Sequence, residues 1–408
     1  MPEFKNKTSA SKALDGVNFF LADVRDGLGP YLSIYLLAVK GPEQGWNEAS
    51  IGLVMTIAGL CGLLTLSPIG YIIDKVNAKR ALLILAALIV TTGCLFLPFV
   101  SSFFIITFTQ SVTTMAAGVF APAIAGISLG IVGPRYFTRR IGRNEAFNHA
   151  GNFFSAALAA IGAYLFGPEV VFWLMAILTI FSIISILLIP SSSIDKKAVQ
   201  GIDESAGPPL EFKKILLVPS LLIFAFLMAV FHLANAAMLP TLGQYLSKLV
   251  GAEHATSLVA LCTMAAQIVM IPIALLVAAK ADLWGRKKFI ILAFFFLTLR
   301  GFLYPLWDNV YWLFFVQLFD GVGAGILGAL LPVVVADIMW GKGNYNSAQG
   351  IVAFIQGVGA ALSASLAGGI VVKFGYAEAF LTLGSIALMG LIIAYFFMPE
   401  TKKTNEIQ

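Results

Sequence analysis

A small set of polar side chains interrupts long apolar stretches of the sequence and is best placed to do chemistry. Carboxyl and imidazole groups can carry protons, while guanidinium and amide groups can bind a polar solute. No combination of nucleophile, acid and base, no phosphate-binding Gly-Lys-Ser/Thr loop and no zinc spacing accompanies them. The sequence therefore predicts proton transfer and solute binding by a protein that is not an enzyme and has no metal and no cofactor. The candidates are Asp23, Arg25, Asp26, His232, Asn235, Gln317 and Asp320.

The spacing of these residues leaves two interpretations open for each group. Asp23 and Asp26 are three residues apart and share one helical face, whereas Arg25 lies on another side. They could carry a coupling proton and hold an anionic group, or they could form a closed structural ion network. Asp320 could take up a proton in a cavity of low dielectric, or it could pair with Arg300. His232 could titrate near neutral pH or serve as a neutral hydrogen-bond donor.

The composition indicates that these groups belong to a membrane protein. Of 408 residues, 12% are charged and 59% are apolar, with a mean hydropathy of +0.91. Soluble domains are about one quarter charged, so a soluble enzyme, a nucleic-acid binder and a disordered chain are excluded as starting hypotheses. Three cysteines, all in apolar runs, give no disulfide framework. About 20 apolar residues span a bilayer, and we identify twelve such stretches, at 15–39, 49–73, 80–100, 103–132, 144–166, 169–190, 215–247, 254–279, 287–306, 310–338, 345–372 and 376–398.

These stretches predict an all-α membrane protein of twelve transmembrane helices arranged as two pseudo-symmetric six-helix bundles. The chain would consist of an N-terminal bundle at 1–190, a cytoplasmic linker at 191–214 and a C-terminal bundle at 215–408. Three short matches between the halves, at offsets of 210, 208 and 198 residues, indicate duplication of a six-helix unit. Parallel repeats with a site near mid-membrane are a transporter architecture.

The basic residues predict the orientation of the chain. One side of the predicted membrane collects 21 Lys and Arg residues, and the other has only Lys40, Lys248 and Lys373. Because cytoplasmic loops are enriched in Lys and Arg, both termini and the linker are expected in the cytoplasm of a bacterial cell, with the protein in its inner membrane. The net charge of +5 is thus a topology signal, and no nucleic-acid partner is expected.

Two loops carry related sequences after the second and the eighth predicted spans. Each contains an Asp followed by basic residues: Gly70, Asp74, Lys79 and Arg80 in the first, and Asp282, Gly285, Arg286 and Lys287 in the second. Over essentially its whole length, the chain resembles the major facilitator superfamily of secondary transporters. These loops are similar to that family's Gly-x-x-x-Asp-Arg-x-Gly-Arg-Lys/Arg motif, although Asn77 replaces the usual glycine and Ala78 a common basic residue.

The resemblance implies a function for these loops and a place for the polar residues. A carboxylate at a helix end could pair with basic groups and hold the cytoplasmic side closed as a latch, or the loops could be ordinary positive-inside loops. Spans one, four, seven and ten would line the cavity. The drug-antiporter subclass is not established, because residues 110–118 of span four contain no arginine and residues 162–168 fit the Gly-Pro signature of span five poorly.

A further polar patch recurs in predicted spans five and eleven. Its members are Asn148, His149 and Asn152 in one span and Asn346, Gln349 and Gln356 in the other. A polar face at the cytoplasmic ends of these helices would suit a gate or a substrate vestibule. Polar packing between helices is an equally good interpretation.

The sequence thus favours a secondary active transporter that moves a small polar or amphipathic solute by alternating access. We expect proton coupling and a monomer in the lipid bilayer, and we favour export over import. A facilitative uniporter and an uptake symporter are alternatives within the transporter class. A non-transporting membrane receptor or assembly partner on the same fold is the alternative of another class.

Overall fold

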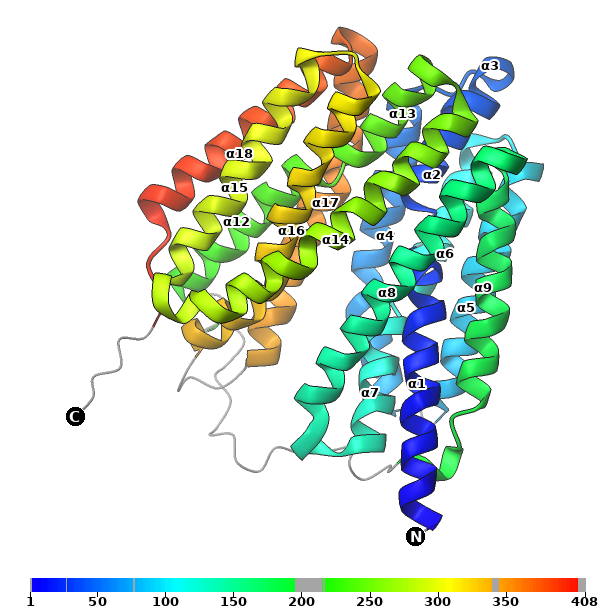
Figure 1. Ribbon diagram of the computed structural model, residues 1–408, viewed down its shortest axis with the longest axis vertical. Helices are drawn as coiled ribbons and strands as arrows, with labels where there is room; N and C mark the ends of the chain where they lie inside the picture. The colour runs from blue at the N-terminus through cyan, green and yellow to red at the C-terminus, as the bar shows by residue number, and fades with distance from the viewer. Residues whose placement is uncertain are drawn as a thin grey trace. The chain divides into compact units, whose positions relative to one another are not determined.

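The computed structural model describes residues 2–26, 28–75, 78–194, 215, 217–339 and 345–402, and every regular element among them is a helix (Figure 1). The first half of the chain forms α1 (Pro2–Asp26), α2 (Gly29–Ile34), the π-helix η1 (Tyr35–Lys40), α3 (Gly41–Gln44), α4 (Glu48–Lys75), α5 (Lys79–Phe96), η2 (Leu97–Phe99), α6 (Phe103–Ala117), α7 (Phe120–Val132), α8 (Pro134–Phe166), α9 (Val170–Leu187) and η3 (Ser191–Ser193). The second half forms α12 (Pro219–Asn235), α13 (Met238–Val250), α14 (Ala252–Trp284), α15 (Arg286–Leu303), η4 (Tyr304–Leu306), α16 (Val310–Met339), α17 (Tyr345–Phe374) and α18 (Tyr376–Phe397).

The predicted all-helical membrane fold is confirmed. Eleven helical stretches within the described residues are long and apolar enough to cross a bilayer. The first predicted span, 15–39, is not one of them, because its helix is interrupted: α1 ends at Asp26 and α2 begins at Gly29. Gly29 has a φ of 42° and Pro30 follows it. A positive φ and a missing backbone N–H both end a continuous helix.

Two other predicted spans are interrupted as well. Predicted span four is divided into α6 and α7 around Gly118, and predicted span seven into α12 and α13 after Asn235. Discontinuous helices free backbone groups at membrane depth, which is tolerated where they are buried in protein or line a wet cavity. The interruptions therefore occur in three of the four spans that the family resemblance assigns to the cavity.

The chain folds into two compact units that do not coincide with its two sequence halves. A short helical segment of each half belongs to the other unit: residues 47–56, at the start of α4, belong to unit 2, and residues 247–261, which include the start of α14, belong to unit 1. In unit 2, Thr56 Oγ1 donates a hydrogen bond of 2.6 Å to the carbonyl oxygen of Ala361. In unit 1, Ser257 Oγ donates one of 2.9 Å to the carbonyl oxygen of Ala160. The exchanged segments are thus anchored to helix backbones by hydroxyl groups.

A corresponding close backbone contact occurs in each unit. In unit 1, a Cβ on Gly151 of α8 would lie 2.0 Å from the carbonyl oxygen of Phe19 on α1. In unit 2, a Cβ on Gly359 of α17 would lie 2.2 Å from the carbonyl oxygen of Ala229 on α12. The paired positions are 208 and 210 residues apart, which supports the duplication inferred from sequence. With an offset of 208 residues, the repeat position equivalent to Asn148 is Gln356 rather than Asn346. This offset is ten residues larger than the offset of 198 used in the sequence match of the polar patch.

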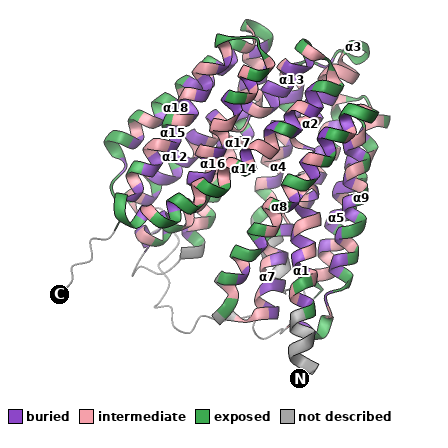
Figure 2. Cartoon of the chain, in the orientation of Figure 1, coloured by how far each residue is buried: buried purple, intermediate pink, exposed green. Residues whose placement is uncertain are grey.

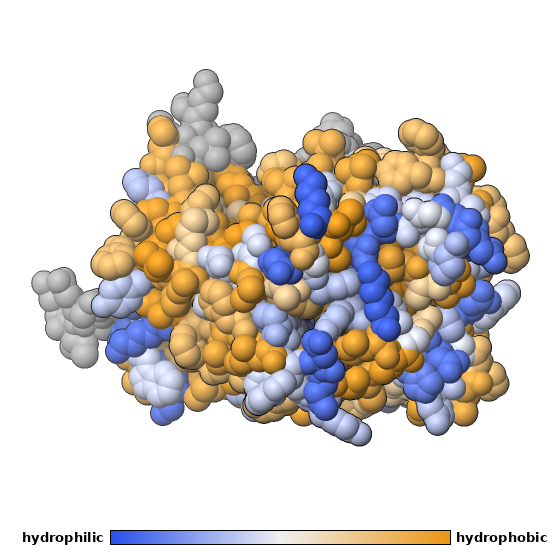
Figure 3. All heavy atoms as spheres, turned by 90° about the horizontal axis from the view of Figure 1, so that it is seen from above, coloured by the Kyte–Doolittle hydropathy of each residue, from blue (hydrophilic) through white to orange (hydrophobic). Residues whose placement is uncertain are grey.

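The outward helix faces suit a hydrocarbon environment. Figure 2 shows buried and exposed residues along the same helices, so that a helix has one face in protein and another outside. Phe104 and Tyr311 are 82% and 85% exposed, and many other large apolar side chains are exposed with them. Figure 3, which looks onto one end of the helices, shows hydrophilic residues lying among hydrophobic ones. Exposed apolar side chains along the helices are what the hydrocarbon of a bilayer requires.

The glycine contacts give a first prediction. Gly359→Ala is expected to lower the free energy of unfolding by about 1–3 kcal/mol, because the new methyl group must displace the backbone of α12. Gly369→Ala on the same helix is the control, since a Cβ there meets no other atom within 4 Å. Thermal unfolding in detergent measures the difference. Equal melting temperatures for the two variants would show that the close approach of α12 and α17 is not required.

Candidate functional site

A buried polar network joins α12, α15 and α16 within unit 2. Its centre is Arg300, which is 0% exposed. Arg300 Nη1 lies 2.7 Å from Asp320 Oδ1 and 2.5 Å from Asn235 Oδ1. Its Nη2 donates to Gln317 Oε1 at 2.7 Å, and its Nε donates to the Tyr304 hydroxyl at 3.0 Å. The structure thus gathers three of the predicted site residues around an arginine that sequence analysis treated only as a possible partner of Asp320.

The composition of this network determines what it can do. Arg300 has one charged partner, Asp320, and three neutral acceptors. If Asp320 binds a proton, the guanidinium keeps hydrogen bonds to the other three, so its N–H groups are not left unsatisfied in a buried site. The side chain of Asp320 is 19% exposed, whereas that of Arg300 is 1% exposed. The carboxylate is therefore the member of the pair that water or a solute can reach.

His232 lies one helical turn before Asn235 on α12 and is partly buried. Its Nδ1 is 2.9 Å from the carbonyl oxygen of Met228. A carbonyl oxygen only accepts hydrogen bonds, so Nδ1 must carry a proton, and in the neutral ring Nε2 is then the acceptor. This geometry matches the neutral hydrogen-bonded role that was considered for His232, and it leaves Nε2 as the nitrogen that could bind a further proton.

The predicted cluster in the first span lies at the end of α1. Asp23 and Arg25 are both partly buried in the last turns of this helix, directly before its interruption. The side chain of Asp26 lies outside the described residues. On α6, Gln110 is 8% exposed, and its Nε2 has no hydrogen-bond partner among the described residues. A buried unpaired donor is costly, so Gln110 is an additional candidate for binding a solute. The sequence around Gln110 gave no sign of this role.

The polar patch of α8 and α17 is only partly described. Asn148, His149 and Asn152 are partly buried on α8. On α17, Gln349 is partly buried, and Gln356 holds a buried Oε1 without a hydrogen-bond partner among the residues described. The side chain of Asn346 lies outside the described residues. Gln356 therefore has an open acceptor among the described residues.

The structure reveals an ion cluster at the start of unit 1 that the sequence analysis missed. Asp15 on α1 is 5% exposed and pairs with two arginines of α8. Its Oδ1 lies 2.7 Å from Arg140 Nη2, and its Oδ2 lies 2.7 Å from Arg143 Nη2. Arg140 also donates to Asn144 Oδ1 at 2.7 Å, and Asn144 donates to the Ser128 hydroxyl on α7. The cluster ties three helices together. Its only sequence signal was an acidic residue at the edge of the first apolar stretch.

The second predicted latch loop is an ion network within unit 2. Arg286 lies 2.6 Å from Asp282 and 2.9 Å from Asp337 on α16. The carboxylate of Glu400, three residues after α18, accepts hydrogen bonds from the backbone N–H groups of Arg286 and Lys287 at the start of α15. Glu400, rather than Asp282, therefore occupies the positive end of the helix.

Gly285 makes the contact with Glu400 possible. It has a φ of 89°, and a Cβ there would lie 2.2 Å from Glu400 Oε2. The motif glycine is thus required both by the backbone conformation and by the space that the carboxylate occupies. Neither Glu400 nor Asp337 resembles a motif residue, so only the folded chain shows that they belong to this network.

The first loop is organised differently. Gly70 lies within α4, and the side chain of Asp74 lies outside the described residues. Lys79 is 6% exposed and packs beside Gly126 of α7. Arg80 donates to the carbonyl oxygens of Ile186 and Leu187 at the end of α9, and to the hydroxyl of Ser191. Its guanidinium thereby satisfies carbonyl groups that the end of α9 leaves open.

Hydrogen bonds from the backbone control the charge of Glu400. Burial acts to raise the pKa of this carboxyl group, but the backbone N–H groups of Lys402, Arg286, Lys287 and Thr401 outweigh burial and hold its pKa below the ordinary value of 4.5. A carboxyl group with a lowered pKa in the folded state stabilises the fold above its ordinary pKa. The contribution disappears as the pH falls through the lowered value.

Glu400→Gln is accordingly expected to destabilise unit 2 by about 1 kcal/mol at neutral pH. This is the cost of losing a helix cap that solvent screens in part. The difference from the wild-type protein should vanish below pH 4.5 as Glu400 itself becomes protonated. Melting temperatures measured across this pH range test the prediction, with the exposed Glu43→Gln as control. A difference that is independent of pH would contradict it.

Solved structures with the same fold are transporters. The nucleoside transporter NupG superposes with a TM-score of 0.71 at 14% identity, covering 96% of this chain and 98% of that one. The D-xylose-proton symporter gives a TM-score of 0.71 at 14% identity, covering 98% and 99%. At this identity the likeness shows the fold, which is two pseudo-symmetric six-helix bundles. The chain therefore has the fold of a multi-pass membrane protein.

Sequence comparison gives the family. The model of the Major Facilitator Superfamily matches residues 16–280 and again 225–408. An uncharacterized MFS-type transporter of Mycobacterium tuberculosis is 47% identical over 395 residues, which cover 96% of this chain and 93% of that protein. Multidrug resistance protein 2 of Bacillus subtilis is 30% identical over 130 residues, 31% of each chain. The chain belongs to the Major Facilitator Superfamily, as the loop motifs predicted.

Proposed function

We propose that this transporter couples the movement of a small polar or amphipathic solute to protons by alternating access, with Asp320 as a proton carrier. The observation that carries the proposal is the Arg300 network, in which a partly exposed carboxylate is paired with a buried arginine that has three other acceptors. When such a carboxylate binds a proton, its partner keeps hydrogen bonds to the three neutral acceptors. A solute that reaches the same atoms could compete for them.

The proposed orientation places both termini in the cytoplasm of a bacterial cell, with the protein acting as a monomer in the inner membrane. It is supported by the asymmetry of 21 basic residues against three across the predicted spans. Export is the proposed direction. One relative, matched over 31% of its length, is named for multidrug resistance.

The remaining predicted residues have supporting roles in this proposal. Asp23, Arg25 and Asp26 flank an interrupted helix and would take part in binding the solute or in coupling, and His232 and Asn235 would share in the same chemistry. Gln110 and Gln356, each with an open hydrogen-bonding atom, would bind polar groups of the solute. The network of Asp282, Arg286 and Glu400 would stabilise the cytoplasmic end of α15 in one state of the cycle.

Solute-dependent proton movement tests the proposal. Purified protein is reconstituted into liposomes that contain a pH-sensitive dye, and solutes are added one at a time: a nucleoside, D-xylose, 5-aminolevulinic acid and a cationic dye such as ethidium. A coupled transporter changes the internal pH with at least one solute. Solute entry without a pH change would indicate a uniporter, and binding without entry would indicate a receptor. Either result would overturn the proposal.

A further inference from the structure

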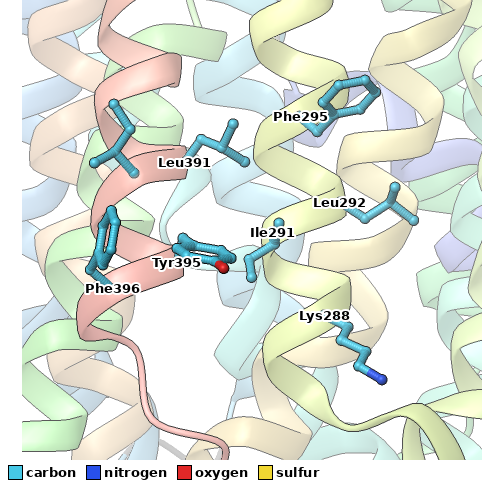
Figure 4. Close-up of a pocket in the computed structure, with 8 residues that line it drawn as sticks. Lys288, Ile291, Leu292, Phe295, Leu391, Tyr395 and Phe396 are labelled. Carbon is cyan, nitrogen blue, oxygen red and sulfur yellow. The ribbon is translucent and has the colours of Figure 1, made fainter.

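A groove runs between α15 and α18 on the exposed side of unit 2. It has a volume of about 340 Å³ and lies where α15 begins and α18 ends. Figure 4 shows residues of its lining, with Ile291 of α15 and Leu391 and Tyr395 of α18 between the two helices and Lys288 nearest the start of α15. Lys288, Ile291, Leu292 and Phe295 follow one another on α15 at helical spacing. Tyr395 and Phe396 contribute from α18 and are 61% and 70% exposed, so the groove is open to the surroundings of the protein.

The groove is a local feature of two helices that otherwise touch. Farther along, a Cβ on Gly301 of α15 would lie 2.4 Å from the Cα of Gly384 on α18. The ring of Phe294 likewise fills the place that a Cβ on Gly390 would take. Contact through glycine fixes the helix pair there, whereas the bulky residues nearer the start of α15 leave a hollow. The hollow is therefore built into the packing of this pair.

One end of the groove is basic. Lys288 lines it, and Lys287 Nζ lies 6.0 Å from the centre of the Tyr395 ring. Glu400, the nearest acidic residue in this network, accepts from the backbone N–H of Lys287 and caps the helix. Among the described residues, no carboxylate lies within 4.0 Å of either lysine ammonium group. Both charges are therefore available to a ligand at the end of an apolar channel.

The duplicated first half shows that this arrangement is not a general property of the fold. Lys79 and Arg80 occupy the positions 208 residues before Lys287 and Lys288. Lys79 is buried against α7, and Arg80 is bound to carbonyl oxygens of α9. The two basic residues of the first half thus contact other helices of the protein. In the second half, Lys288 lines the groove and Lys287 Nζ lies beside the ring of Tyr395.

We propose that the groove binds an anionic phospholipid, with an acyl chain along Ile291, Leu292 and Phe295 and the phosphate at Lys288 and Lys287. The ligand must be amphipathic, since one long wall is apolar and one end is cationic. It must be anionic, because basic side chains at the membrane surface attract negative headgroups, and a zwitterionic headgroup would bring its own cation beside the lysines. The inference is independent of which solute the protein transports.

Binding of lipid to the purified, delipidated protein tests this inference. Native mass spectrometry and melting temperatures are recorded with phosphatidylglycerol, with phosphatidylcholine of the same chains and with inorganic phosphate. We expect phosphatidylglycerol to be retained and to raise the melting temperature, and we expect the other two to do neither. Lys288→Gln should weaken phosphatidylglycerol binding about five-fold, the effect of one lysine near an anionic headgroup.

Two variants distinguish lipid binding in the groove from general electrostatic attraction between the protein and anionic lipid. Lys373→Gln removes one exposed charge at the end of α17 and should bind phosphatidylglycerol as the wild type does. Leu292→Trp keeps both lysines, fills the apolar part and should reduce retention of the lipid. The inference is overturned if Lys288→Gln and Lys373→Gln bind equally, if phosphatidylcholine binds as well as phosphatidylglycerol, if inorganic phosphate stabilises as much as the lipid, or if Leu292→Trp retains the lipid fully.

Discussion

Replacing Asp320 by asparagine is expected to abolish accumulation of solute driven by a proton gradient while leaving solute exchange intact. Asparagine keeps a hydrogen-bond acceptor for Arg300 but cannot carry a proton at neutral pH. With an imposed difference of one pH unit, coupling to one proton can support about a ten-fold solute gradient in the wild-type protein. In Asp320→Asn the solute concentrations on the two sides should become about equal, because the coupling to protons is lost while exchange of solute continues.

The measurement compares accumulation and counterflow in the same liposomes, with a solute found by proton flux. Asp308→Asn serves as the control, because Asp308 is an exposed carboxylate that accepts a hydrogen bond from Tyr245 outside the Arg300 network. It should accumulate solute as the wild type does. If Asp320→Asn still builds the full gradient, the proton is carried elsewhere, and Asp23 and Asp26 become the residues to test.

Replacing Arg300 by methionine is expected to lower the free energy of unfolding by about 3 kcal/mol. The change leaves Asp320 charged and without its partner, which is the costly way to break a buried ion pair. Asp320→Asn should cost less, about 2 kcal/mol, because asparagine and the three neutral acceptors still accept hydrogen bonds from the Arg300 guanidinium. The asymmetry between the two single variants follows from the composition of the network.

A double variant distinguishes the lost pair from lost packing. Arg300→Met combined with Asp320→Leu removes both charges and should recover most of the stability, since uncharged side chains of similar volume can replace a buried pair at little cost. Thermal unfolding in detergent gives the comparison. A double variant that is no more stable than Arg300→Met would mean that the aliphatic packing of Arg300, and not its charge, is what the fold requires.

The sequence predicted the class of fold well because its signals are local. Runs of apolar residues identify spans, although they did not show that the first span is interrupted after α1. The site could be predicted only in part, since it depends on which helices meet. Asp320 and Arg300 are 20 residues apart on different helices, and only packing shows their 2.7 Å contact. Asp15 and Glu400 had no motif context. Their partners, Arg140 and the start of α15, are 125 and 114 residues away.

The segments exchanged between the two compact units determine what would happen if the chain were divided at its central linker. A gene cut at the central linker would yield two polypeptides, and neither would contain a complete unit. Residues 47–56 of unit 2 would be in the first polypeptide, and residues 247–261 of unit 1 would be in the second. Each fragment would therefore need a segment of the other to complete its compact unit.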